Sequence, residues 1–357
     1  MSPLLVGSIC LISTTAQASG LLIGHDSATT TTTTLGSSTT TTGPIPTTTY
    51  PVVTGNTVHV PAEPDALIQV GGDIWVASCS GNAVTEINAT TKQIVQELNN
   101  PSYQFDCPDS LAFDGGHIWV ANQLGSSITE LNASTGSWVS TLSGSSFLNP
   151  NALAVSGTDI WISNDSLKGN MGSFISEINS SNGTVIRVIN TPKSFKFIFG
   201  DPTALAVSGT NIWVSDSANT NAIEFSTVNG VYLRETTGGP AVTNGECVTY
   251  NSGYIWLSSN NAVIEYNATT GGYIRSINNI DNPSQLIFTG GDLFVIAKNP
   301  TGTVREYNST GTFLRTIARS NIGWGNGIRS ILIDGTSLWV ASYSANSVSF
   351  YSVKTAK

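Results

Sequence analysis

Polar and ionisable residues recur at one fixed place in a repeated pattern along this chain. They lie ten positions before each of seven similar strand centres, and they are Asp65, Asp109, Asn151, Thr203, Glu246, Ser284 and Arg329. If the repeats are arranged around an axis, these side chains surround one channel mouth. Three carboxylates and an amide supply the oxygen ligands that a hard cation such as Ca²⁺ prefers. Asp65, Asp109 and Glu246 are therefore candidate metal ligands, and Asn151 and Arg329 are candidate ligand-binding residues beside them.

A plainer interpretation of this set is that polar residues line a water-filled channel and cap the strands that begin there. Arg329 places a positive charge among the acids, and Glu246 lies away from the other two in the series. Both features favour a lining over a metal site, because a cation needs its oxygen ligands close together and is repelled by a neighbouring positive charge.

The strand centres are aromatic residues flanked by aliphatic ones, roughly 40–50 residues apart. They are Trp75, Trp119, Trp161, Trp213, Trp256, Phe294 and Trp339. An aliphatic residue lies eight positions before each centre, and a proline lies eleven positions before five of them. A register kept in all seven repeats predicts seven copies of one structural unit.

Each repeat contains four short segments with strand character. The first is apolar throughout, as in residues 152–155, and the third alternates between apolar and polar residues, as in 128–131. Units of four strands with this period are propeller blades. The last repeat stops after its third strand, and residues 57–60 supply the missing one, which closes the ring and removes an open edge. The sequence thus predicts an all-β, seven-bladed β-propeller over residues 56–357.

The segment before the repeats has a different composition. Residues 4–12 form a short apolar run, and Ala16-Gln17-Ala18 is a small-x-small cleavage motif, so residues 1–18 are predicted to be a signal peptide. The run is too short to span a bilayer. Thr runs interrupted by Gly and Pro follow, and residues 19–55 are predicted to be a disordered stalk. The predicted location is secreted or cell surface.

The net charge and the dispersed basic residues disfavour polyanionic partners. The net charge is −9, only 10% of the residues are charged, and the 14 basic residues are dispersed. Binding to nucleic acid requires clustered Lys and Arg, so nucleic acid and anionic membranes are poor partners. Few ionisable groups also predict tolerance of an acidic exterior.

Two stretches carry a resemblance to known propellers. Trp119-Val120-Ala121-Asn122 followed by residues 128–132, and Trp339-Val340-Ala341-Ser342 followed by residues 346–348, resemble the YVTN/NHL type of extracellular repeat. This resemblance implies scaffolding, surface or ligand-sensing roles. Some propellers of similar repeat are lyases that depend on a histidine base, but His25, His59 and His117 lie outside the predicted mouth. A Ca²⁺-dependent, lactonase-like hydrolase remains an alternative, with Asp65, Asp109, Asn151 and Glu246 as ligands.

Long connections are predicted on one face of the ring, because only the connections after the second and fourth strands vary in length. Insertions gathered on one face of a repeat protein often mark its binding side. Aromatic residues in these connections would form a rim for a protein or carbohydrate partner; they are Tyr103, Phe105, Phe147, Phe195, Phe197, Phe199 and Trp324. The alternative is that the Phe195, Phe197 and Phe199 side chains pack inward between blades.

Cys79 ends a second strand and Cys107 precedes the first strand of the next blade, so a structural disulfide between them is expected. The sequence motifs indicate no catalytic residue. The function predicted is a binding or scaffold module that uses the long-loop face, without a cofactor unless Ca²⁺ binds. The alternatives are the hydrolase and a structural surface-layer component that associates with itself.

Overall fold

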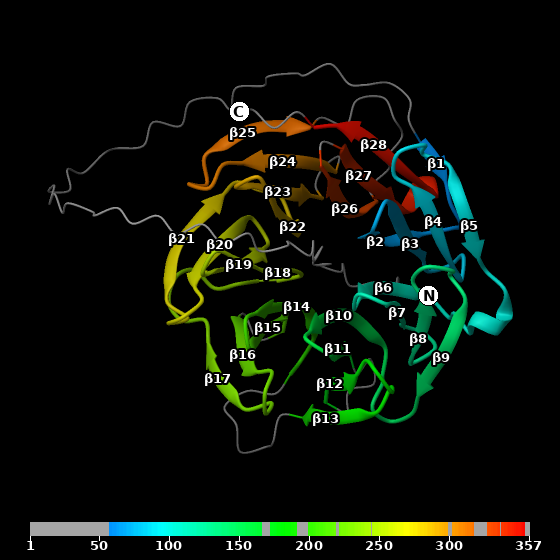
Figure 1. Cartoon of the computed structure of the whole chain (residues 1–357). Helices are drawn as coiled ribbons and strands as arrows, with labels where there is room; N and C mark the ends of the chain where they lie inside the picture. Colours follow the sequence, from blue (N-terminus) through cyan, green and yellow to red (C-terminus); the bar gives the residue numbers. More distant parts are fainter. Residues whose placement is uncertain are drawn as a thin grey trace, which may run out of the picture.

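Seven antiparallel sheets of four strands each are arranged around a central axis, as the computed structural model shows (Figure 1). The structure describes residues 57–165, 172–190, 199–218, 221–243, 245–298, 302–317, 327–335 and 337–353. The predicted seven-bladed β-propeller is confirmed. The expected signal peptide and stalk, residues 1–55, lie outside the described residues.

The strands follow the chain order within each blade, from the axis outward. Blades 1 to 3 contain β2 (Pro64–Val70), β3 (Asp73–Ser78), β4 (Ala83–Asn88) and β5 (Ile94–Leu98); β6 (Pro108–Phe113), β7 (His117–Asn122), β8 (Ser127–Asn132) and β9 (Trp138–Ser143); and β10 (Pro150–Ser156), β11 (Asp159–Asn164), β12 (Phe174–Asn179) and β13 (Val185–Asn190). Blades 4 and 5 contain β14 (Pro202–Ser208), β15 (Asn211–Asp216), β16 (Asn221–Ser226) and β17 (Tyr232–Glu235); and β18 (Val248–Asn251), β19 (Tyr254–Ser259), β20 (Ala262–Asn267) and β21 (Tyr273–Asn278).

Blade 6 contains β22 (Pro283–Thr289), β23 (Asp292–Ala297), β24 (Thr303–Tyr307) and β25 (Phe313–Ile317), and blade 7 contains β26 (Ile328–Asp334), β27 (Ser337–Ser342) and β28 (Ser347–Ser352). The described residues also include two short 3₁₀ helices, η1 (Pro101–Tyr103) and η2 (Tyr343–Ala345).

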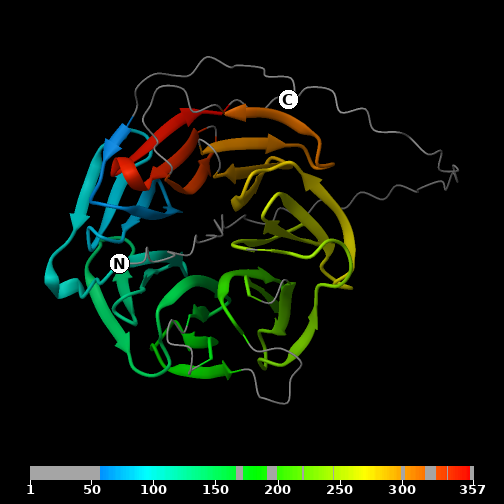
Figure 2. The ribbon, with the colours of Figure 1, turned by 180° about the vertical axis from the view of Figure 1, so that it is seen from behind.

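The ring closes through strand β1 (Thr57–His59), which completes blade 7. It pairs antiparallel with β28, and Val58 lies opposite Val348 (Figure 2). Because the first and last strands share one sheet, blade 7 has the four strands of the other blades. The predicted closure by the N-terminal strand is confirmed.

The aromatic residue at the centre of each second strand packs against apolar residues of a neighbouring blade. Trp161, for example, is fully buried and packs in one cluster with Leu205, Ile212 and Val214 of blade 4. Removing such a side chain typically costs about 3–5 kcal/mol, so these joints account for much of the ring's stability.

A glutamate lies opposite the aromatic centre in the third strand of blades 1 to 6, and the outer strand supplies its partner. Arg187 Nε lies 2.6 Å from Glu177 Oε2, and Arg234 Nε lies 2.7 Å from Glu224 Oε2. Arg275 pairs with Glu265 and also donates to the Ser309 carbonyl of the next blade at 2.8 Å. The recurring glutamates are therefore structural parts of the repeat.

Blade 7 has no glutamate opposite its aromatic centre. Phe350 takes the glutamate position opposite Trp339, and the cation comes from Lys92 in the third turn of blade 1. The Lys92 Nζ lies 4.2 Å from the Trp339 ring centroid and 4.8 Å from that of Phe350. A cation–π contact thus replaces the ion pair at the joint where the ring closes.

Most of the Asn-x-Ser/Thr motifs are explained by the turn after the third strand, whereas Asn164 is the last residue of β11. The Asn132 Oδ1 accepts backbone hydrogen bonds from Ser134 and Thr135, and Asn267 and Asn308 do the same with their followers. In blade 4, Ser226 stands at this place and its Oγ accepts from the Val228 N–H. The turn therefore requires a side-chain acceptor, which asparagine and serine both provide.

Candidate functional site at the channel mouth

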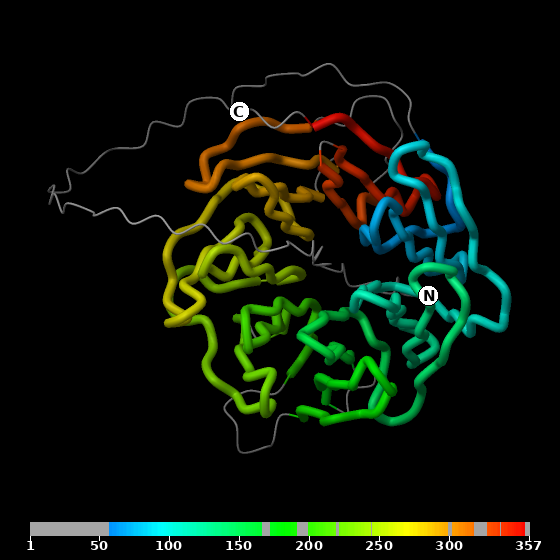
Figure 3. The backbone as a smooth tube through the Cα atoms, in the orientation of Figure 1, coloured from blue at the N-terminus to red at the C-terminus, as the bar shows by residue number. Residues whose placement is uncertain are grey.

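The residues of the predicted channel mouth begin the seven inner strands or immediately precede them, and these strands surround the axis (Figure 3). Asp65, Asp109, Asn151, Thr203 and Ser284 are buried. The Glu246 and Arg329 side chains are partly exposed. Proline at the start of five inner strands fixes the local backbone and requires no ladder donor there, so the polar side chain that follows has the same place in these five blades.

Two of these polar side chains bond across the joint to the next blade. The Asn151 Nδ2 donates to the Pro202 carbonyl at 3.0 Å, and the Thr203 Oγ1 donates to the Gly245 carbonyl at 2.9 Å. The Asn151 Oδ1 in turn accepts from the Ser163 hydroxyl at 2.5 Å. At these two joints the mouth residues therefore cap and connect the inner strands, which supports the lining interpretation.

Charged groups form two pairs on the mouth. The Arg329 Nε lies 3.4 Å from Asp65 Oδ1, and the Lys298 Nζ lies 2.5 Å from Glu246 Oε2. Burial lowers the pKa of Lys298, while the Glu246 carboxylate beside it acts in the opposite direction. Lys298 was missed by sequence reasoning. It lies four residues after its aromatic centre, the position of Cys79 and Gln123 in other blades, so extending the register would have found it.

Asp65 and Asp109 are buried carboxylates whose charge is poorly compensated. Burial raises the pKa of Asp65 to about 7, although the Arg329 guanidinium lowers it. Burial also raises the pKa of Asp109 well above its usual value, and the Asp65 charge adds to this. Both Asp109 carboxyl oxygens and Asp65 Oδ2 are buried without a hydrogen-bond partner. Such groups favour their uncharged form.

The structure brings Asp65, Asp109 and Arg329 together but places Glu246 with Lys298. Within the described ranges, no group of three or more His, Cys, Asp or Glu side chains is placed to hold a metal ion. The Asn151 amide is also engaged, through both its oxygen and its nitrogen. The described residues therefore do not assemble the predicted calcium ligands into one site.

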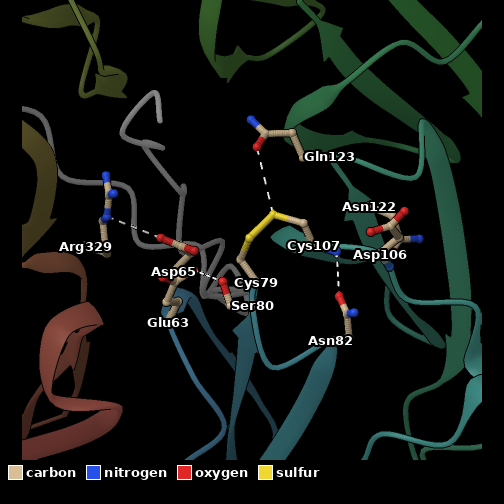
Figure 4. The surroundings of a disulfide bond; sticks show 10 residues. All are labelled: Glu63, Asp65, Cys79, Ser80, Asn82, Asp106, Cys107, Asn122, Gln123 and Arg329. Carbon is tan, nitrogen blue, oxygen red and sulfur yellow. Dashed lines mark hydrogen bonds and ion pairs between the residues drawn. A yellow bond between two sulfur atoms is a disulfide. The ribbon is translucent and has the colours of Figure 1, made fainter. Parts of the chain in front are cut away.

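The expected disulfide joins blades 1 and 2 above the mouth (Figure 4). The Cα atoms of Cys79 and Cys107 lie 3.8 Å apart. The Cys107 N–H donates to the Asn82 side chain at 2.8 Å, and the Cys107 carbonyl accepts from the Gln123 N–H at 2.9 Å. The predicted bridge is confirmed, and it lies on the face of the long connections.

The predicted aromatic rim is wrong for two of its members. Phe147 and Phe199 are buried between blades, at 4% and 1% exposure, because both side chains pack against apolar residues of the blade joints. The alternative of inward packing therefore holds for Phe199. Tyr103 and Phe105 are half-buried and stack with ring centroids 5.4 Å apart. Phe195, Phe197 and Trp324 lie outside the described residues.

The fold and this mouth define the class of the protein as a seven-bladed β-propeller. No protein-family model matches the chain, and no protein of curated function matches it. Among solved structures, hydrazine synthase of Kuenenia stuttgartiensis is similar with a TM-score of 0.65 and 14% identity, over 82% of this chain and 96% of that one. The computationally designed protein Ika8 is similar with a TM-score of 0.59 and 13% identity, over 83% and 98%. Similarity at this level of identity supports the fold alone.

No helix in the described part of the chain is long and apolar enough to cross a membrane. The Cys79–Cys107 disulfide is compatible with an extracellular location, since disulfides persist in oxidising compartments.

Proposed function

We propose that this chain is a secreted or cell-surface propeller of the YVTN/NHL type that binds a protein or carbohydrate through its long-loop face. In this proposal the inner-strand polar residues hold the ring together, and the Thr-rich segment before residue 56 is a spacer. The pairing of Asp65 with Arg329 and of Glu246 with Lys298, and the bonds of Asn151 and Thr203 to backbone carbonyls, favour this structural role of the mouth over the enzyme alternative.

The observation that carries the proposal is the unequal length of connections on the two faces. On one face, the first turns have two or three residues, as in 71–72 and 114–116, and the third turns keep one length, as in 89–93, 133–137 and 268–272. On the other face, connections between blades range from 279–282 to 236–247. Variation confined to one face of a uniform frame is typical of a binding side.

A test compares one substitution on each face. Asp106 is exposed in the 99–107 connection beside the disulfide, and Ser137 is exposed in a third turn on the opposite face. The purified propeller is titrated calorimetrically against a panel of defined oligosaccharides and synthetic peptides. Any ligand found is expected to bind about tenfold more weakly to the Asp106→Arg variant, a loss of about 1.4 kcal/mol, and normally to Ser137→Arg. Weakening by Ser137→Arg alone, or turnover of the ligand, would reject the proposal.

A surface-layer role is a second candidate, and the outer strands favour it. In six blades the residue before the partner of the third-strand glutamate is an exposed aliphatic. This aliphatic belt consists of Val95, Val139, Ile186, Leu233, Ile274 and Leu314, with exposures between 38% and 54%. Outer strands also present unpaired backbone edges, so the belt suits contact between copies of the same chain.

Sedimentation velocity at rising protein concentration tests this second candidate. Self-association is expected to disappear in the Ile186→Thr, Ile274→Thr variant. It is expected to persist in the Leu124→Thr control, because Leu124 is 57% exposed but lies off the belt. A wild-type protein that stays monomeric throughout would remove the surface-layer role and leave ligand binding untouched.

A further inference from the structure

In five blades the third turn begins at an asparagine, and a serine or threonine lies two residues later. These asparagines are Asn88, Asn132, Asn179, Asn267 and Asn308, in blades 1, 2, 3, 5 and 6. The turn itself needs only a side-chain oxygen at its start, because in blade 4 the Ser226 Oγ accepts the same bond from the N–H of Val228, which has no hydroxyl. The turn therefore accounts for the asparagine but not for the later hydroxyl. Together the two residues are the acceptor motif for N-linked glycosylation.

In blades 2, 5 and 6 the asparagine nitrogen is available for modification. The Oδ1 atoms of Asn132, Asn267 and Asn308 accept the backbone N–H two residues later, at 3.0, 2.9 and 3.1 Å. Their Nδ2 atoms have no hydrogen-bond partner among the residues that the structure describes. All three side chains are half-buried and are followed by exposed turn residues.

Two other asparagines of this motif have engaged nitrogens. In blade 1 the Asn88 Nδ2 donates to the Asp73 Oδ1 at 2.9 Å, because Asp73 lies opposite it in the neighbouring strand. Asn164 is fully buried at the end of β11, and its Nδ2 donates to the Ser176 Oγ at 3.1 Å. A glycan is bulky and lies on the surface, so the folded ring has no room for one on Asn164.

An aromatic residue begins the fourth strand directly after each of the three available asparagine turns. Trp138 and Tyr273 are exposed, at 44% and 39%, and Phe313 is half-buried. Blades 1 and 3 have the aliphatic residues Ile94 and Val185 at this place. An aromatic ring beside the turn offers a surface on which the apolar C–H face of a sugar can pack.

We propose that Asn132, Asn267 and Asn308 carry N-linked oligosaccharides, on the face opposite the long connections. In the transfer, the Nδ2 attacks the anomeric carbon of an oligosaccharide that is held on a lipid-linked phosphate. The N–C bond forms, the C–O bond to the phosphate breaks and leaves its electron pair on the phosphate, and one amide proton passes to a base of the transferase. The oligosaccharides cover the third-turn face and leave the long-loop face open. This inference rests on the export that the proposed function includes, because the motif is modified in secreted chains.

Peptide mapping by mass spectrometry tests the proposal on the full chain, purified from the cells that naturally produce it. Peptides containing Asn132, Asn267 and Asn308 are expected to carry a saccharide mass on the asparagine, whereas Asn88 and Asn164 should be unmodified. A saccharide on Asn88 or Asn164 would overturn the role of the available nitrogen. Sequencing of the N-terminus separates two kinds of failure. Unmodified asparagines in a chain cleaved after Ala18 would overturn the glycosylation alone, and an uncleaved, unmodified chain would reject the proposed export together with it.

A pair of threonine variants separates the motif from the turn. Thr269→Val removes the hydroxyl of the motif and keeps the turn, as Val228 does in blade 4. The saccharide is expected to disappear from Asn267 and to remain on Asn132, with the melting temperature of the unglycosylated ring unchanged. Thr270→Val is the matched control, because the Thr270 Oγ1 also donates to Asn267 Oδ1, at 3.2 Å, but lies outside the motif. A saccharide that persists in Thr269→Val, or that is lost in Thr270→Val, would overturn the proposal.

Discussion

At the scale of single residues, blades 3 to 7 place a cation beside the residue that lies opposite the buried aromatic centre, and the chain supplies it from different places. In blade 5, the Arg275 guanidinium lies 5.4 Å from the Trp256 ring centroid and pairs with Glu265. In blade 7, Phe350 replaces the glutamate, and Lys92 crosses from blade 1. A hydrophobic residue at the glutamate position removes a charge from a buried site, so the lysine contacts both rings, and its nearby anion is Asp334.

Lys92→Met keeps the length of the side chain and removes its charge. The variant is expected to be less stable than the wild type by about 0.5–2 kcal/mol, the usual range of a partly desolvated cation–π contact. Urea unfolding at neutral pH measures this difference. Lys92→Arg is the matched control, because it keeps the cation and should unfold near the wild-type midpoint. Unchanged stability of Lys92→Met would show that the contact is only geometric.

At the scale of elements, the contacts between neighbouring blades determine the stability of the ring. Blades 1 and 2 are connected by the Cys79–Cys107 bridge, and blades 7 and 1 by the Arg329–Asp65 ion pair. Blade 7 is completed by the three residues of β1, the shortest of the described strands. The disulfide adds a covalent link in the blade next to this closure. It lowers the conformational entropy of the unfolded chain and thereby stabilises the folded ring.

The double variant Cys79→Ser, Cys107→Ser is expected to lose roughly 3–4 kcal/mol of unfolding free energy, the loop entropy of a bridge across this sequence separation. Thermal unfolding followed by circular dichroism measures the loss, and the spectrum of the folded variant should stay that of a β protein. The same samples with dithiothreitol provide the control, since the reductant should destabilise the wild type but not the variant. A wild type that is unaffected by reduction would contradict this role.

Much of the fold could be predicted because the inner two strands keep one register. Their residues are buried on both sides, so each blade repeats the same apolar pattern around Trp119 or Trp161. Side-chain partners at the mouth were harder to predict, since Glu246 and Lys298 meet only through the curvature of the ring. The burial of the Phe147 and Phe199 side chains was equally hard to predict from the sequence. An apolar insertion suits solvent exposure or a blade joint equally well by sequence, and packing determines which of these it adopts.

At the scale of the whole molecule, buried carboxyl groups determine how stability depends on pH. Burial raises the pKa of Asp65 and Glu177 to about 7, and it raises the pKa of Asp109, Asp165, Glu86, Glu224 and Glu306. Asp114 is an exception, because hydrogen bonds from Trp119 and the backbone outweigh its burial and lower its pKa. The sequence predicted acid tolerance from the scarcity of ionisable groups, whereas the structure indicates it from their placement.

The folded protein is therefore expected to be more stable near pH 4 than near pH 7.5. A carboxyl group whose pKa is higher in the folded state keeps its proton after the unfolded chain has lost it. The folded state then binds more protons between about pH 4 and pH 7, and stability falls as the pH rises through that window. Thermal melts across this range measure the trend, and Glu177→Gln should flatten it because one contributing group no longer titrates. A melting temperature that drops on acidification to pH 4 would show that the ion pairs of Glu177, Glu224 and Glu306 with their outer-strand arginines outweigh the effect of burial.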